Sequence, residues 1–213
     1  MSATTATKVE FWFDPACPFC WMTSRWLVDV SKDRNLDIDW QPISLMFKNN
    51  PPLDSPFYLR GSFTRDLLRV VESVRAAGHG DQIGALYTEF GRRIHHQDTP
   101  IFDHDEVAAI LLGLGLDTAH AAALNDESFD AAIKLGMAEG LSLVGDDVGT
   151  PIIAVTGRQG RVGLFGPVIT ALPDEEDRLR LWDGFLAMVD APGFFELKRT
   201  RKDSPDMSTI GEF

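Results

Sequence analysis

The stretch of residues 9–21 constrains this chain more than any other. An apolar run at 9–13 ends at Asp14-Pro15 and leads into Cys17 and Cys20, which are the only 2 cysteines among the 213 residues. Beyond Cys20 the apolar residues recur with a helical period. The sequence therefore predicts a strand that delivers both cysteines to the start of a helix.

This placement gives the two cysteines different chemistry. At a helix N-terminus, unpaired backbone N–H groups and the positive end of the helix dipole favour a thiolate, so we expect Cys17 to be the nucleophile. Cys20 follows on the same side, shielded from solvent and close enough to form a disulfide, so we expect it to resolve the reaction. Pro18 suits a first helical turn, where no N–H is needed. The pattern is typical of a thioredoxin-like dithiol site in a thiol-disulfide oxidoreductase.

Three other interpretations of the cysteine pair are less favoured. A zinc site needs four ligands, but no second C-x-x-C exists, and His95 and His96 are adjacent and poorly spaced, so we expect no metal. A structural disulfide across so short a loop adds little stability, and a cytosolic compartment would reduce it. Two unrelated buried cysteines would not require the flanking strand and helix start.

Composition and charge restrict the partners. With 44% hydrophobic and 24% charged residues the chain has an ordinary globular composition, and its net charge of -12 argues against nucleic acid or an anionic membrane. The N-terminus lacks the apolar segment of a secretory signal, and no stretch is long enough to span a membrane, so we expect a cytoplasmic location. In a reducing compartment a dithiol favours reduction or exchange. The expected substrate is a small molecule, or a protein thiol or disulfide.

Strand signals stand on both sides of a long helical region. The apolar run at 9–13 predicts a central strand, and the alternation at 36–40 predicts an edge strand, with a helix at 17–32 between them. A loop is expected at 48–56 because of its Asn and Pro content. After the helical region we expect a hairpin of strands 152–155 and 162–165 around a turn at 156–160, a helix from 173–175 that buries Leu179, Trp182, Leu186 and Val189, and a loose tail at 203–213.

The helical region reaches from the loop to about Leu143. Two apolar stripes predict helices, and acidic residues predict the starts of three more. The stripes are Phe63, Leu67, Val70 and Val74, ending at Gly78, and Ile83, Tyr87, Phe90 and Ile94; the starts are Asp103 with Glu106, Asp117 and Asp126, the last preceding Phe129, Ile133 and Met137. The expected fold is α/β, a thioredoxin-like domain at 1–58 and 146–213 with an inserted all-helical subdomain at 59–145.

Thr150-Pro151 precedes the first strand of the hairpin. In thioredoxin-like folds a proline at this place is cis and packs against the dithiol, whereas a proline standing alone is more often a plain turn residue. Because the following strand should neighbour residues 9–13, we favour the cis form. The backbone of Thr150 would then be open to a substrate, with its side chain near the sulfur.

Several separate motifs resemble one known family. They are residues 11–26 (FWFDPACPFCWMTSRW), 92–97 (RRIHHQ), 145–151 (GDDVGTP), 165–167 (FGP) and 194–201 (FFELKRTR). Together they resemble the actinobacterial DsbA-like family of mycothiol-dependent nitroreductases over nearly the whole chain. The resemblance implies a DsbA-like fold, mycothiol as the reducing co-substrate, no tightly bound cofactor and reduction of nitroaromatic compounds.

Carried onto this chain, the resemblance also implies roles for single residues. Cys17 attacks, Cys20 resolves, and Thr150 and Pro151 flank the site. The expected substrate contacts are Pro18, Phe19, Trp21, Asn49, Tyr58, His95, Thr150 and Pro151. Phe19 departs from the tryptophan frequent in the family, which removes an indole donor and ring area from the substrate surface.

Alternatives stay open at this point. A protein-directed disulfide oxidoreductase or isomerase shares the fold, and a kappa-class glutathione transferase or chromene-carboxylate isomerase commonly has serine in place of Cys17. A non-enzymatic redox-controlled binding module is a third. His95 and His96 either stabilise a thiolate and shuttle protons or simply cap a helix, and Asp14 either tunes Cys20 or forms the turn before Pro15. The sequence leaves the oligomeric state open, including a homodimer.

Overall fold

Residues 6–97 and 103–211 are described by a computed structural model. In this part of the chain, β1 (Thr7–Phe13), β2 (Leu36–Pro42), β3 (Ile152–Gly157) and β4 (Gly160–Phe165) form a mixed sheet in the order β2-β1-β3-β4. β1 runs parallel to β2 and antiparallel to β3, and β3 and β4 form a hairpin. The predicted central and edge strands are thereby confirmed.

One face of the sheet is covered by α1 (Pro18–Arg34) and α7 (Glu175–Val189). Val9, Phe11 and Phe13 of β1 are fully buried in the large core on this face. Trp26 of α1 and Trp182 of α7 meet with ring centroids 6.2 Å apart. The helix predicted after the first cysteine is confirmed, and its expected inward residues are buried: Trp21, Trp26, Leu27 and Val30.

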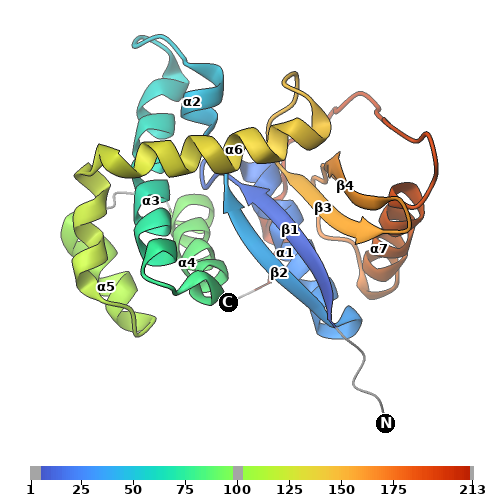
Figure 1. Cartoon of the computed structure of the whole chain (residues 1–213), viewed down its shortest axis with the longest axis horizontal. Helices are drawn as coiled ribbons and strands as arrows, with labels where there is room; N and C mark the ends of the chain where they lie inside the picture. The colour runs from blue at the N-terminus through green and yellow to red at the C-terminus, as the bar shows by residue number, and fades with distance from the viewer. Residues whose placement is uncertain (1–5, 98–102, 212–213) are drawn as a thin grey trace.

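The opposite face is covered by α6 (Asp130–Val144), which crosses in front of the strands in Figure 1 while α1 lies behind them. Trp12 points to this face, and its Nε1 donates to the carbonyl oxygen of Gly136 at 2.8 Å. Leu141 and Ile152 complete a second, smaller apolar cluster around Trp12. Both faces of β1 are therefore covered and mostly apolar, as its sequence predicts, although Glu10 on the Trp12 side is only half-buried.

The region between β2 and α6 is helical, as predicted. In the two predicted apolar stripes every residue is buried except Phe63, which is half-buried. Asp103, Asp117 and Asp126 each cap the N-terminus of a helix or 3-10 turn. Gly78 follows the first long helix with φ +89°. The helices are α2 (Leu45–Asn49), α3 (Pro56–Ala76), α4 (Ile83–His96) and α5 (His104–Gly113), with 3-10 turns η1 (Gly80–Gln82), η2 (Thr118–Asn125) and η3 (Glu127–Phe129). The domain division at 58 and 145 stays a prediction.

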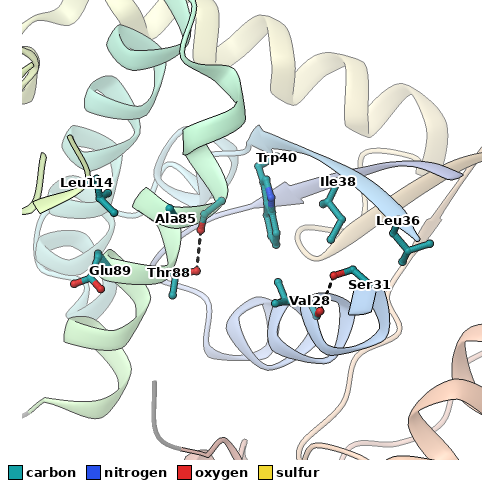
Figure 2. Close-up of a pocket in the computed structure, with 10 residues that line it drawn as sticks. Val28, Ser31, Leu36, Ile38, Trp40, Ala85, Thr88, Glu89 and Leu114 are labelled. Atoms are coloured by element: carbon teal, nitrogen blue, oxygen red, sulfur yellow. Dashed lines mark hydrogen bonds between the residues drawn. The ribbon is translucent and has the colours of Figure 1, made fainter. Parts of the chain in front are cut away.

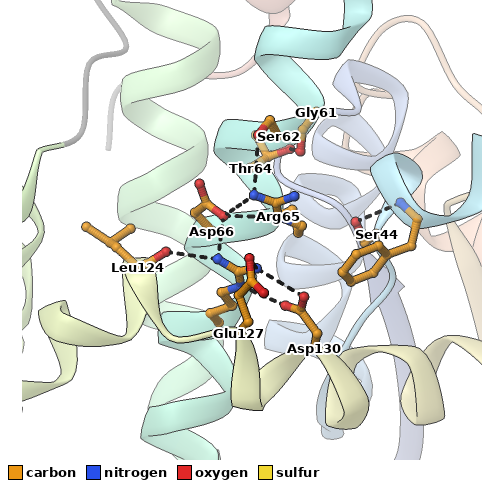
Figure 3. A network of polar contacts seen from close by, with 11 residues as sticks. Ser44, Gly61, Ser62, Thr64, Arg65, Asp66, Leu124, Glu127 and Asp130 are labelled. Atoms are coloured by element: carbon orange, nitrogen blue, oxygen red, sulfur yellow. Dashed lines mark hydrogen bonds and ion pairs between the residues drawn. The ribbon is translucent and has the colours of Figure 1, made fainter. Parts of the chain in front are cut away.

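A buried arginine joins this helical region to α6 through Asp66, Leu124 and Asp130, the partners that Figure 3 labels. Arg69 of α3 is 3% exposed, and its Nε and Nη2 donate to the two carboxylate oxygens of Asp130 at 2.6 and 3.0 Å. Its Nη1 donates to Asp66 at 3.0 Å and to the Leu124 carbonyl at 3.3 Å. A paired, two-pronged contact of this kind fixes orientation as well as distance, so α3 and the start of α6 are held in register.

Three local expectations need correction. The loop expected at 48–56 begins as α2, and the ladder of the hairpin continues to Gly157 and Gly160, so that 158–159 alone form the turn. The expected loose tail is partly docked within 203–211. Met207 of η4 (Met207–Thr209) packs against the core, and Ile210 is 8% exposed, because burying these apolar side chains removes them from water. Residues 1–5 and 212–213, part of the leader and tail expectations, lie outside the described residues.

No described helix is both long enough and apolar enough to cross a membrane.

Two glycines of α6 give a matched test of its packing. A Cβ at Gly140 would lie 2.7 Å from Trp12 Nε1, whereas one at Gly136 would lie 3.6 Å from the Pro42 oxygen, an ordinary contact. We expect Gly140→Ala to destabilise the protein by about 1–3 kcal/mol through overpacking. Gly136→Ala should leave the free energy of unfolding unchanged or raise it by up to about 1 kcal/mol through helix propensity. Urea unfolding measures both, and equal losses would contradict the close approach of α6 to Trp12.

Candidate active site

The turn before the cysteines is held by a buried carboxylate. Asp14 is fully buried; its Oδ1 accepts from the N–H of Ala16 at 2.7 Å, and its Oδ2 accepts from the N–H of Leu45 at 2.6 Å. The backbone of the turn closes with the Cys17 N–H donating to the Asp14 carbonyl at 3.0 Å. Asp14 thus forms the turn, as one of the two sequence interpretations has it, and also ties it to α2.

Cys17 caps the N-terminus of α1. Its Sγ accepts from the Cys20 N–H at 3.4 Å and lies 3.7 Å from the Thr150 carbonyl, to which the thiol donates. Both cysteines are free thiols, with Cys17 9% exposed and Cys20 fully buried. The expected geometry is present: one sulfur at the helix tip near the surface, and a second one turn below it.

Cys17 does not have the lowered pKa that its place at a helix N-terminus predicts. Burial raises the pKa of the Cys17 thiol to about 11, and the charge of Asp14 acts in the same direction. The N–H groups of Cys20 and Phe19 and the charge of Arg201 lower that pKa, but by less. The helix N-terminus therefore acts as predicted and is outweighed by desolvation, which the local sequence does not reveal.

Two hydroxyl groups reach the Cys20 sulfur. Thr150 Oγ1 lies 3.1 Å from Cys20 Sγ and 2.7 Å from the Trp12 carbonyl, and the Tyr87 hydroxyl donates to Cys20 Sγ at 3.8 Å. Burial and the neighbouring Cys17 raise the pKa of Cys20 far above its ordinary value, while Thr150 and Tyr87 lower it. Sequence reasoning placed Tyr87 only in an apolar core stripe; its polar end within that stripe is the one signal of a further role.

The Thr150-Pro151 peptide bond is cis, which confirms that prediction. The expected contact of the Thr150 side chain with a sulfur is also present, and the sulfur is that of Cys20. The Thr150 carbonyl faces Cys17. Thr150 therefore touches both members of the dithiol, one through its backbone and the other through its side chain.

Trp21 does not lie at the surface, which argues against its expected substrate contact. Its side chain is fully buried: His95 stacks on it with ring centroids 5.7 Å apart, and the Arg25 guanidinium lies 4.1 Å from its ring centroid. Its Nε1 donates to His96 Nε2 at 3.0 Å. Trp21 instead packs the cysteine helix against α4 of the helical region.

His95 is neutral at physiological pH. Burial and the charge of Arg60 lower its pKa to about 3. Because the Pro15 carbonyl can only accept, Nε2 of His95 carries the proton and donates to it at 2.9 Å. The interpretation of His95 as a cation beside the thiolate is therefore wrong, and the side chain steadies the cysteine turn instead.

The other expected substrate contacts differ in their exposure. Phe19 is half-buried on the core, Tyr58 is half-buried in the first turn of α3, and Asn49 is exposed at the end of α2. In the described part of the chain, no side-chain hydrogen bond or ring contact joins Asn49 or Tyr58 to the cysteine turn. Their substrate contacts stay predictions, as does that of Pro18.

A separate hollow of about 450 Å³ opens between α1, α4 and β2, seen in Figure 2. Val28, Ile38, Trp40 and Ala85 line it, and none of the expected site residues does. Across the described residues, no group of three or more His, Cys, Asp or Glu side chains is placed to hold a metal ion. The candidate active site of the described residues is therefore the turn that holds Cys17 and Cys20.

Solved structures of similar architecture include two that are named for disulfide chemistry. The cytosolic disulfide reductase DsbM from Pseudomonas aeruginosa aligns with a TM-score of 0.58 at 15% identity, covering 84% of this chain and 98% of that one. A putative protein disulfide isomerase from Nitrosomonas europaea aligns with a TM-score of 0.57 at 14% identity, covering 86% and 98%. The fold and the site define the class of thioredoxin-fold proteins that have a DsbA-like helical insertion and a C-x-x-C dithiol at the start of the first helix.

The sequence narrows this class. Residues 16–199 match the Rv2466c-like family, that of the mycothiol-dependent nitroreductase Rv2466c, and the chain belongs to that family. The uncharacterized protein Rv2286c of Mycobacterium tuberculosis (strain ATCC 25618 / H37Rv) is 27% identical over 208 residues, which are 97% of this chain and 87% of the relative. The resemblance and the fold class predicted from sequence are confirmed.

The pH dependence of stability tests the buried state of Asp14. Burial raises the pKa of this carboxyl from 3.8 to about 6, although its hydrogen bonds act to lower that pKa. The protonated carboxyl therefore makes its full contribution to stability below about pH 3.8, and this contribution is lost as the pH rises through about 6. Asparagine does not titrate. The stability of Asp14→Asn relative to wild type should therefore increase by about 3 kcal/mol between about pH 4 and pH 7. Urea unfolding across this range measures it, and a constant difference would contradict it.

The hydroxyl of Tyr87 is open to a conservative test. Tyr87→Phe keeps the ring stacked on Phe13, 4.1 Å between centroids, but removes the donor to Cys20. We expect closure of the Cys17–Cys20 disulfide from a mixed disulfide to slow about tenfold, because a hydrogen bond to the forming thiolate is lost. Chemical quenching with mass spectrometry follows both steps. The first attack should not slow, and Thr23→Val, which removes an α1 hydroxyl bonded to the Pro167 carbonyl, should change neither step.

Proposed function

We propose that this chain is a cytoplasmic thiol-disulfide oxidoreductase whose Cys17–Cys20 dithiol is recycled by mycothiol and reduces nitroaromatic small molecules. The single observation that carries the proposal is the pair of sulfurs themselves, one at the tip of α1 and the other fully buried beneath it. Membership in the family of the mycothiol-dependent nitroreductase Rv2466c supports mycothiol as the recycling thiol and nitro compounds as the substrate class.

The proposed cycle begins with the Cys17 thiolate. With a disulfide substrate it forms a mixed disulfide and releases one thiolate; Cys20 then loses its proton and displaces the second, leaving the Cys17–Cys20 disulfide. With a nitro group, the dithiol gives up two electrons and two protons and yields a nitroso group and water. Two molecules of mycothiol restore the dithiol through a mixed disulfide on Cys17 and leave as mycothiol disulfide.

The surroundings of the dithiol support these roles. Cys17 retains some exposure, and the residues expected to border the cleft, Asn49 and Tyr58, are exposed or half-buried on α2 and α3. Thr150 and Tyr87 are positioned to stabilise negative charge on Cys20 when it becomes the attacking or leaving sulfur. The chemistry needs no bound metal, flavin or nicotinamide.

An assay with two substrate classes tests the proposal. Reduced protein is offered nitroaromatics and protein disulfides side by side, with mycothiol or glutathione as the sole recycling thiol. We expect turnover of nitroaromatics with mycothiol, none for Cys17→Ser, and a trapped mixed disulfide on Cys17 for Cys20→Ser, detected by mass spectrometry.

Other outcomes point to other functions. Turnover of protein disulfides alone would indicate a protein-directed oxidoreductase, and isomerase activity retained in Cys17→Ser would indicate the transferase-like branch. Ligand or protein binding that survives in Cys17→Ser without any turnover would indicate a redox-controlled binding module.

A further inference from the structure

The segment after α7 brings a positive charge to the dithiol. In Figure 1 it is the red loop that leaves α7 and arches back, without regular structure through residues 194–206. Within it the run 198–202 (KRTRK) is basic and has no acidic residue, in a chain whose net charge is -12. A basic segment beside the reactive sulfur of an acidic protein suggests a role in choosing substrates.

Arg201 lies directly over a residue of the C-x-x-C turn. Its guanidinium carbon is 4.6 Å from the centroid of the Phe19 ring, a cation-π contact. Phe19 stands between the two cysteines, and the charge of Arg201 lowers the pKa of Cys17. The ring therefore acts as a platform that holds the guanidinium next to the nucleophile.

The donors of Arg201 face solvent. The residue is exposed, and within residues 6–97 and 103–211 its side chain forms no ion pair or hydrogen bond, in contrast to Arg34 and Arg178, which bind carboxylates. Arg60, also exposed, places a second positive charge near the turn, where it lowers the pKa of Asp14 and His95. A guanidinium with open donors matches the planar, two-oxygen geometry of a carboxylate.

We propose that Arg201, seated on Phe19, forms an anion-binding subsite beside Cys17 that selects aromatic substrates carrying a carboxylate close to the group to be reduced. The inference rests on the proposed function and adds its substrate class. Phe19 is only half-buried, so the aromatic ring of such a substrate packs against its exposed part while the carboxylate binds Arg201.

The reduction of such a substrate follows the cycle of the dithiol. When the Cys17 thiolate attacks an aromatic disulfide, the new Cys17–S bond forms as the S–S bond breaks, and the electron pair leaves on the aryl thiolate. Cys20 then loses its proton and displaces the second aryl thiolate, so that both electrons of the dithiol end on the two products and the released protons pass to bulk water. Arg201 acts on the carboxylate of the ring and not on the sulfur, so its contribution is to binding.

Two aromatic disulfides separate recognition from chemistry. Dithiobis(nitrobenzoate) carries a carboxylate on each ring, whereas dithiodipyridine carries none. For Arg201→Gln we expect kcat/KM with dithiobis(nitrobenzoate) to fall roughly tenfold, mainly through KM. With dithiodipyridine we expect kcat/KM to change by less than about twofold. Arg201→Lys should recover part of the loss, because the charge returns without the planar fork.

Arg199→Gln is the matched control, since it removes the same charge from the same segment without touching Phe19. We expect it to leave the ratio of the two substrates unchanged. Equal losses with both disulfides in Arg201→Gln, or the same selective loss in Arg199→Gln, would overturn the subsite while leaving the dithiol chemistry intact. Absence of turnover of both disulfides and of nitroaromatics by the wild type would overturn the proposed function itself.

Discussion

The site depends on a carboxylate placed where a charge is costly. Asp14 is fully buried, yet its two oxygens receive the N–H groups of Ala16 and Leu45, so the turn after β1 and the start of α2 share one acceptor. The Thr64 hydroxyl of α3 also bonds to it. Relaxing the turn would leave buried donors unsatisfied, which costs more than the bonds themselves contribute. The location of Cys17 is thus set by contact between the sheet and the helical region, and not by the C-x-x-C alone.

The helical region contributes to the chemistry as well as to the shape of the site. Tyr87 and His95 both come from α4, and the first donates to the Cys20 sulfur while the second donates to the Pro15 carbonyl. Trp21, the residue directly after Cys20, is packed between Arg25 and His95. A displacement of α4 would therefore change the surroundings of both sulfurs together, which couples the insertion to the dithiol through ordinary packing.

What the sequence predicts well is local periodicity. Three features follow from spacing along one element: the stripe of Ile83, Tyr87, Phe90 and Ile94, the caps at Asp103 and Asp117, and the mostly apolar faces of β1. What it misses depends on partners far along the chain. The target of the Tyr87 hydroxyl, the neutral state of His95 and the docking of Ile210 each require knowing which surfaces meet, and no pattern within an element contains that information.

The wrong expectation for Cys17 has a functional consequence. A helix N-terminus that lowers a thiol pKa stabilises the reduced form and makes a disulfide strongly oxidising, as in DsbA itself. Here burial raises the pKa of Cys17 to about 11 and that of Cys20 further still. The order of ionisation is kept, so Cys17 remains the sulfur that attacks first. The helix N-terminus alone therefore does not decide which sulfur ionises first; the deeper burial of Cys20, beneath a Cys17 that keeps some exposure, decides it.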